Sequence, residues 1–317
     1  MAAVAPVFGV VAILIAIWYA AVPPMNIAWA VDRAPDEVVT LPPDTGFAGA
    51  VARAAPGWAL VVRNPDLVPG TLNQDRPVLP APHQVMAELL STTMGVAPMR
   101  ERRGEMRGNP RSLVFHAWQT LAPTVLGFVF GTAAGILLAI GIVHNRAMGM
   151  SVMPWAIASQ MVPILAIAPM VIVVLNAVGI SGLLPKSLIS AYLSFFPVVV
   201  GMVKGLRSPA GPDLDLMHTY SASPSQVLWK LRFPAATPYL FASLKVGIAA
   251  SLVGAIVAEL PTGARFGLGS RLLSGSYYGQ TIEIWSALFM AAICAATLVG
   301  LVGLTERLFS RRMGAAG

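Results

Sequence analysis

Four polar side chains lie inside or at the ends of long apolar runs. Ser159 and Gln160 precede a stretch that contains Pro163 and Pro169, Asn176 lies near the end of that run, and Glu259 ends a later one. Because polar groups are costly to place in lipid, these four side chains are candidates for a solute path through a membrane. The alternatives are a hydrogen bond between helices for the glutamine, and a structural hydrogen bond to a loop or neighbouring helix for the glutamate.

No catalytic or metal-binding pattern accompanies them. A membrane-embedded enzyme needs paired acids, an H-E-x-x-H helix or a Ser/His set within the apolar runs, and none is present. The single cysteine, Cys294, lies in an apolar run and is interpreted as a packing residue. The histidines are scattered without metal-ligand spacing: His83, His116, His144 and His218. We therefore predict that the chain is not an enzyme and binds no metal.

The composition indicates an integral membrane protein. Of the 317 residues, 56% are hydrophobic and only 11% are charged, although soluble domains carry roughly 25% charged residues. The net charge of +7 comes from Arg and Lys in the hydrophilic connections, which is typical of membrane proteins and excludes a nucleic-acid patch. We predict an all-α fold with about six transmembrane helices: Pro6–Val22, Leu121–Val143, Trp155–Val178, Leu188–Val203, Leu240–Leu260 and Ile284–Leu304.

The first apolar run has two interpretations. Ala28–Ala30 ("AWA") has the form of a signal-peptidase site, so the run could be a cleaved signal. However, the first five residues carry no Lys or Arg, which favours a retained helix.

The distribution of cations predicts the orientation. Short connections on one side hold Lys186, Arg265 and Arg271, whereas the other side holds Arg146, Lys204, Arg207, Lys230, Arg232, Arg307, Arg311 and Arg312. The second side is therefore predicted to be cytoplasmic, together with both termini. The long connection 23–120 then lies outside, although it contains nine arginines.

That connection is rich in proline, so we expect its middle to be irregular. Residues 81–94 read as a short amphipathic helix with Val85, Leu89 and Leu90 on one face. The arginine run Arg100–Arg111 is interpreted as a solvated loop.

A polar stretch, Asp215–Pro238, interrupts the apolar runs and is here named the hydrophilic hairpin. Ser223 is a good N-cap and Pro224 a good first helical residue, so we expect a second short helix that ends at Pro234 and Pro238. Such a hairpin is either a docking element for a soluble partner or an ordinary interfacial helix. Its expected apolar sides are Leu214, Leu216 and Met217, then Val227, Leu228 and Leu231.

The hairpin resembles the cytoplasmic signature of ABC-importer permeases: Glu-Ala-Ala, three residues, Gly, nine residues, then Ile-x-Leu-Pro. Asp215 takes the Glu position, Leu216 and Met217 replace the two alanines, Ser221 takes the Gly position, and Leu231–Pro234 ("LRFP") ends the pattern at the same spacing. The segment Pro77–Arg312 is similar to the branch that includes taurine, sulfonate, nitrate and pyrimidine-precursor permeases. The residues that the resemblance assigns to ATPase coupling are Asp215, Leu216, Met217, Ser221, Ala222, Ser223, Leu231, Phe233 and Pro234.

This resemblance implies a type I importer permease of the bacterial inner membrane. It divides the chain into a first helix (1–22), an outer connection (23–120), a core domain (121–312) with a coupling segment (205–238) between spans 4 and 5, and a tail (313–317). It further implies two cytoplasmic ATPases that bind ATP and Mg²⁺, a second permease and an external solute-binding protein. The chain has no phosphate-binding loop of its own.

The implied solute is small and polar, either a pyrimidine-like or other nitrogen-containing compound, or a sulfonate or nitrate. The region from Gly254 to Gln280 resembles the pyrimidine-type members more. Two other classes remain as alternatives: an ATP-independent secondary transporter, in which inverted repeats are expected, and a membrane scaffold, which needs no coupling hairpin.

Overall fold

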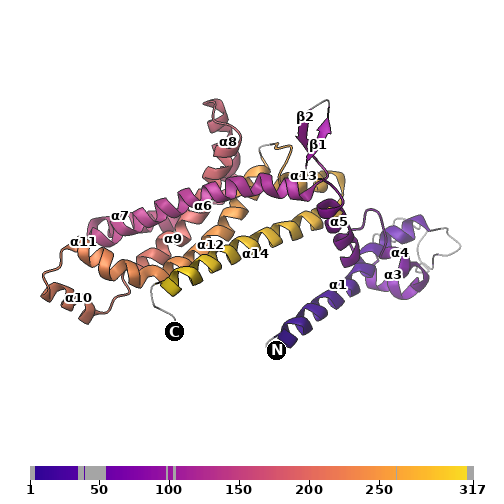
Figure 1. Ribbon diagram of the computed structural model, residues 1–317. Coiled ribbons are helices and arrows are strands. Elements are labelled where there is room, and N and C mark those ends of the chain that lie inside the picture. The colour runs from indigo at the N-terminus through magenta and orange to yellow at the C-terminus, as the bar shows by residue number, and fades with distance from the viewer. Residues whose placement is uncertain are drawn as a thin grey trace. The chain divides into compact units, whose positions relative to one another are not determined.

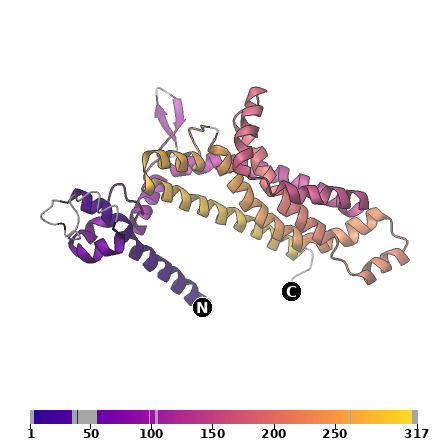
Figure 2. The ribbon, with the colours of Figure 1, turned by 180° about the vertical axis from the view of Figure 1, so that it is seen from behind.

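The computed structural model describes residues 4–34, 39, 55–97, 99–102, 105–261 and 263–312. They form two compact units, one of residues 1–113 with 271–289 and one of residues 114–270 with 290–317. Figures 1 and 2 show their elements from two sides. The elements are α1 Val4–Arg33, α3 Gly57–Arg63, η1 Pro65–Leu67, α4 Val68–Thr71, α5 Pro82–Met94, β1 Met99–Arg102, β2 Glu105–Gly108, α6 Leu113–His144, α7 Arg146–Ser159, α8 Ile164–Ala177, α9 Leu183–Leu206, α10 Gly211–Thr219, α11 Pro224–Val227, η2 Leu228–Arg232, α12 Phe233–Glu259, α13 Leu268–Tyr278 and α14 Thr281–Arg312.

The predicted all-α membrane fold is confirmed, with five helices long and apolar enough to span a membrane among the described residues. They are α1, α6, α9, the helix that continues through α12, and α14. The third predicted span, Trp155–Val178, is wrong as a continuous helix. It consists of α7 and α8, which meet at a bend of 96°. Residues 160–163 interrupt the helix, and Pro163 has no N–H with which to continue the α7 hydrogen bonds. The count becomes six only if this bent pair is one span.

In the first unit, α1 is longer than the predicted span Pro6–Val22. It continues through Pro23 and Pro24 to Arg33. Val22, Asn26 and Ile27 are fully buried, and Ile27 packs with Val31 and Leu60 of α3. The segment beside the possible cleavage site is therefore part of this unit's core.

The buried Asn26 side chain connects α1 to the end of α4 and to the residues that follow it. Its Nδ2 donates to the carbonyl oxygens of Thr71 (3.1 Å) and Leu79 (2.8 Å). Its Oδ1 accepts from the backbone N–H groups of Val78 (2.9 Å) and Leu79 (3.0 Å). All of its hydrogen-bonding capacity is thus used on backbone groups that would otherwise be unpaired.

The long connection is more regular than the sequence indicated. The proline-rich middle was expected to be irregular, but residues 57–71 form α3, η1 and α4. Residues 35–38 and 40–54 lie outside the described part of the chain. The predicted amphipathic helix is α5, which buries Val85, Leu89 and Thr92, but Leu90 is 46% exposed and was wrongly placed on that face.

The arginine run is not a loop. β1 and β2 pair as an antiparallel hairpin in which Met99 lies opposite Gly108, and Arg102 opposite Glu105. Antiparallel pairing satisfies backbone groups between the strands, and the pattern of charges along the run gave no sign of it.

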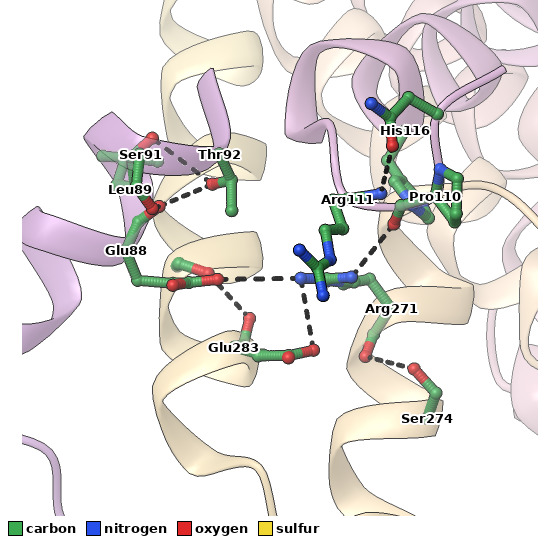
Figure 3. Close-up of polar contacts among 12 residues, drawn as sticks. Glu88, Leu89, Ser91, Thr92, Pro110, Arg111, His116, Arg271, Ser274 and Glu283 are labelled. Atoms are coloured by element: carbon green, nitrogen blue, oxygen red, sulfur yellow. Dashed lines mark hydrogen bonds and ion pairs between the residues drawn. The ribbon is translucent and has the colours of Figure 1, made fainter. Parts of the chain in front are cut away.

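Arg271 joins α13, α14 and α5 within the first unit (Figure 3). Its guanidinium lies 3.2 Å from the Glu283 carboxylate and 3.7 Å from that of Glu88, and it donates to the Pro110 carbonyl oxygen at 3.1 Å. Burial and the neighbouring Glu283 charge raise the pKa of the Glu88 carboxyl, and Arg271 opposes this rise. The cation is thus placed between two carboxylates that would repel each other without it.

In the second unit, α9 packs between α6 and α12, and small residues allow the close approach. Gly127 and Gly131 of α6 face the Ser187–Ser194 stretch of α9. A Cβ added at Gly131 would lie 2.7 Å from the Ala191 carbonyl oxygen. On the other side, a Cβ at Gly254 of α12 would lie 2.8 Å from the Ser190 Cα. This arrangement is the small-residue packing expected of membrane helices.

We expect Gly131→Leu to destabilise the second unit, because the added side chain must push α6 away from α9. Overpacking of this kind costs about 2 kcal/mol or more. The measurement is the fraction of detergent-purified protein that stays monodisperse after heating. Gly300→Leu is the matched control, since a Cβ at Gly300 meets no atom within 4 Å. Equal heat resistance of the two variants contradicts the packing argument.

Candidate functional site

The hydrophilic hairpin consists of α10 and α11 joined by residues 220–223, at one end of the second unit (Figures 1 and 2). Helix α10 ends in a Schellman motif: the Ala222 N–H donates to the Met217 carbonyl at 3.0 Å, and the Ser221 N–H donates to the His218 carbonyl at 2.9 Å. Ser221 has φ +50°, the left-handed conformation that glycine adopts most easily. The residue at the Gly position of the signature pattern therefore has the conformation that explains a glycine there.

The predicted cap of the second helix has the expected geometry. Ser223 Oγ accepts from the Gln226 N–H at 3.3 Å, and Gln226 Oε1 accepts from the Ser223 N–H at 2.8 Å. Pro224 is the first helical residue. This reciprocal pair is a capping box, which fixes the direction of the chain as it leaves the turn.

The predicted end of that helix is wrong. We expected Pro234 and Pro238 to separate it from the next span, but α11 continues through a π-helical turn, η2, directly into α12. Pro234 stands in the first turn of α12, where proline is tolerated, and Pro238 lies inside that helix. The hairpin is therefore attached to α12 without a flexible linker.

The predicted coupling residues divide by exposure. Asp215, Ser221, Ser223 and Pro234 are exposed, and Leu216 is 56% exposed, so its side chain does not join the apolar side. Leu214, Met217, Ala222, Val227, Leu231 and Phe233 are half-buried, and Leu228 is buried. Two exposed aromatic side chains beside this surface, Tyr220 (76%) and Trp229 (59%), were missed. Their positions within an otherwise polar stretch between two membrane helices were the available signal.

Glu259 is fully buried at the end of α12 and holds a segment that follows it. Its Oε1 accepts from Thr120 Oγ1 at 2.9 Å, and its Oε2 accepts from the Gly269 N–H at 2.7 Å. Thr120 Oγ1 in turn accepts from the Leu268 N–H at 2.8 Å. His116, one turn earlier on α6, has Nδ1 2.9 Å from the carbonyl oxygen of Gly267.

We call these residues the Glu259 network: Glu259, Thr120, His116 and Gly267–Gly269. Gly267 has φ +137°, and a Cβ there would overlap the carboxylate. The geometry fits the structural alternative for Glu259, because the carboxylate pairs backbone donors of a loop. The sequence did not predict that Thr120 bonds to Glu259 or that His116 contacts Gly267. The only sign in the sequence was that the two residues are one helical turn apart.

The remaining candidate path residues are not brought together. Ser159 and Gln160 lie at the bend between α7 and α8, and the Tyr192 hydroxyl of α9 donates to the Ser159 carbonyl oxygen. Gln160 Nε2 is buried without a hydrogen-bond partner among the described residues. Asn176 is exposed near the other end of α8, which at 14 residues is about 20 Å long. A shared path through all four predicted residues therefore stays a prediction.

Several known proteins are similar to much of this chain. Residues 131–315 match the family described as binding-protein-dependent transport system inner membrane component. The chain is 31% identical over 196 residues to the riboflavin transport system permease protein of Chloroflexus aurantiacus, which covers 62% of this chain and 71% of that protein. It is 30% identical over 195 residues to the formylaminopyrimidine transport permease protein of Halalkalibacterium halodurans, a match that covers 61% of this chain and 73% of that protein. It is 27% identical over 237 residues to the taurine transport system permease protein of Escherichia coli, a match that covers 73% of this chain and 78% of that protein.

We expect Glu259→Ala to release the segment that the Glu259 network holds. The change leaves the Gly269 N–H without its partner, at a cost of about 1–3 kcal/mol. The measurement is the rate of tryptic cleavage after the exposed Arg265, which should rise relative to the wild type. Thr120→Val, which removes only one of the network's side-chain donors, should give an intermediate rate. Cleavage at the wild-type rate in Glu259→Ala would show that other contacts hold the segment.

Proposed function

This chain belongs to the family of binding-protein-dependent transport system inner membrane components, and from that premise we propose that its hydrophilic hairpin is the docking element for a cytoplasmic ATPase. The chain is a multi-pass permease subunit of an ABC importer for a small solute, and it is a transport subunit rather than an enzyme. This family membership favours the importer over a secondary transporter or a scaffold.

The observation that carries the proposal is the geometry of the hairpin. The left-handed residue at Ser221 closes the Schellman motif, the Ser223–Gln226 pair caps the next helix, and η2 continues into α12. A push on the exposed face of α10 and α11 is therefore transmitted to a membrane helix without a loop that could absorb it. Rigid-body motion of this kind is a common way to switch a transporter between two states.

We propose that two ATPase subunits bind ATP and Mg²⁺ and that this chain itself binds no cofactor. An external binding protein delivers the solute. A second permease would complete the path. The position of α8 is consistent with packing against a helix of that second permease, because α8 departs from α7 at 96° and exposes apolar side chains. They are Leu165, Met170, Val173 and Val174.

The proposed orientation places the hairpin and both termini in the cytoplasm. Arg146 begins α7, Lys204 and Arg207 lie at the end of α9, Lys230 and Arg232 belong to η2, and Arg307 and Arg311 lie near the end of α14. Positive residues concentrate on the cytoplasmic side of short connections. Both termini share that side only if α7 and α8 together count as one crossing.

The names of the relatives indicate the classes of solute to consider. The relatives named above transport riboflavin, a formylaminopyrimidine and taurine according to their names. We propose a solute of this size for this chain, with a nitrogen-containing ring compound or a sulfonate as the two classes to separate.

The test is to purify the tagged chain from its native cells in mild detergent and to quantify the ATPase that co-purifies. Replacing residues 221–231 by a Gly/Ser linker should remove the ATPase. Ser221→Gly should retain it, whereas Ser221→Val should recover several-fold less, because a β-branched residue at φ +50° adds strain of about 1–2 kcal/mol.

Two outcomes contradict the proposal. If the wild type carries no ATPase in several detergents, the hairpin is an interfacial helix. If Ser221→Val recovers as much ATPase as Ser221→Gly, the left-handed turn has no part in docking.

A further inference from the structure

We infer that a polar cleft in the second unit binds the anionic group of the transported solute, and that this solute is a small monoanion. The inference rests on the proposed function as an importer permease. The cleft has a volume of about 330 Å³, at the lower end of the range for small-molecule sites. Its walls come from α6, α8, α9 and the segment before α13: Gln119, Ile172, Asn176, Ser181, Gly182, Pro185, Lys186, Ala264, Arg265 and Phe266.

The lining has the donors that an anion needs. Lys186 and Arg265 supply positive charge, and none of the described residues that line the cleft is acidic. The amides of Gln119 and Asn176 and the Ser181 hydroxyl add neutral donors. Hydrogen bonds from Arg and Lys to a carboxylate or sulfonate are roughly twice as strong as neutral ones, and Arg can bind both oxygens at once.

Other cavities of the described residues lack this chemistry. A larger one of about 450 Å³ between α6, α8 and α9 is lined almost wholly by apolar side chains, among them Phe130, Ile167 and Phe195. One in the first unit, of about 240 Å³, has Asp75, Glu88 and Glu283 in its wall. Neither provides a surplus of positive charge.

The charge balance sets the valence of the ligand. The buried Glu259 interacts electrostatically with Lys186, and its carboxylate oxygens are already hydrogen-bonded to Thr120 and Gly269. Arg265 has no acidic neighbour among the described residues that line the cleft, so at least its positive charge is left for a ligand. A ligand with one negative charge pairs with that cation, whereas a neutral ligand leaves it unpaired.

The start of α9 adds to the attraction. Helix α9 is 24 residues long and begins at Leu183, directly after the lining residues Ser181 and Gly182. No side chain caps it, and its first turn contains no acid. Its free backbone N–H groups therefore add positive potential on the same side of the cleft as Lys186.

The cleft is lined by residues at the start of α9, whereas α10 and α11 follow the end of that 24-residue helix. On the proposed orientation the start of α9 is the outer end, where a binding protein would release its solute. Arg265 and Phe266 belong to the segment that the Glu259 network holds, so the same network fixes one wall of the cleft.

The experiment compares charged and neutral probes of equal shape on the purified full-length chain. Sodium methanesulfonate is paired with dimethyl sulfone, and sodium acetate with acetamide, at constant ionic strength in chloride. Unfolding is followed with a thiol-reactive dye, since the one cysteine of the chain, Cys294, is buried. At least one anion should raise the unfolding temperature, and its neutral partner should not.

Variants locate the effect. Lys186→Gln and Arg265→Gln should each weaken the anion response about tenfold, as expected for the loss of one charge-assisted hydrogen bond. Lys186→Arg keeps the charge and should retain the response. Arg146→Gln, which removes an equally charged but exposed side chain at the opposite end, should leave it unchanged.

The inference is overturned if neither anion acts, if the neutral partners act equally, or if Arg146→Gln weakens the response as much as Lys186→Gln. Failure of the proposed function is a separate result. It appears as absence of ATPase from the wild type, whereas Lys186→Gln should still co-purify with ATPase in the wild-type amount.

Discussion

The close approach of α6, α9 and α12 is the contact on which the second unit depends. In lipid the hydrophobic effect does not drive helices together, so contact area and backbone proximity must do so. Glycines on α6 and α12 provide that proximity on both sides of α9, and Ser251 Oγ of α12 donates to the Thr124 carbonyl of α6 at 2.8 Å. Each of the three helices therefore contacts the other two, so a movement of α12 acts on α6 and α9 directly.

Helix α12 connects the two candidate sites of the second unit. Its 27 residues span about 40 Å. At its beginning it continues from the hairpin through η2, and at its end Glu259 holds the segment that forms a wall of the polar cleft. If the hairpin docks the ATPase and the cleft binds the solute, as proposed above, α12 connects the two sites directly, because the carboxylate at its end pairs the Gly269 N–H and interacts with Lys186.

Sequence patterns predicted the features that depend on neighbouring residues. Apolar length located α6, α9, α12 and α14, and the Ser223–Pro224 pair located the start of α11. The bend at residues 160–163 was missed because proline within an apolar run is compatible with a kink or a break. The predicted end of the second hairpin helix at Pro234 was wrong. The local sequence does not show that η2 continues into α12 and places Pro234 in the first turn of that helix, where proline is tolerated. Glu259 has its partner Thr120 at a separation of 139 residues, which periodicity cannot reveal.

The position of the cations gives the final reason to assign a function to the cleft. Short outer connections are normally poor in Lys and Arg, and on the proposed orientation three such cations remain there. Arg271 is accounted for by its pairing with Glu88 and Glu283 in the first unit. Lys186 and Arg265 instead line one cleft together, and the described lining residues include no acidic side chain. Charges that work against the usual distribution and converge on an open cavity are best explained by a ligand of opposite sign, since stability and topology would both favour neutral residues at these positions.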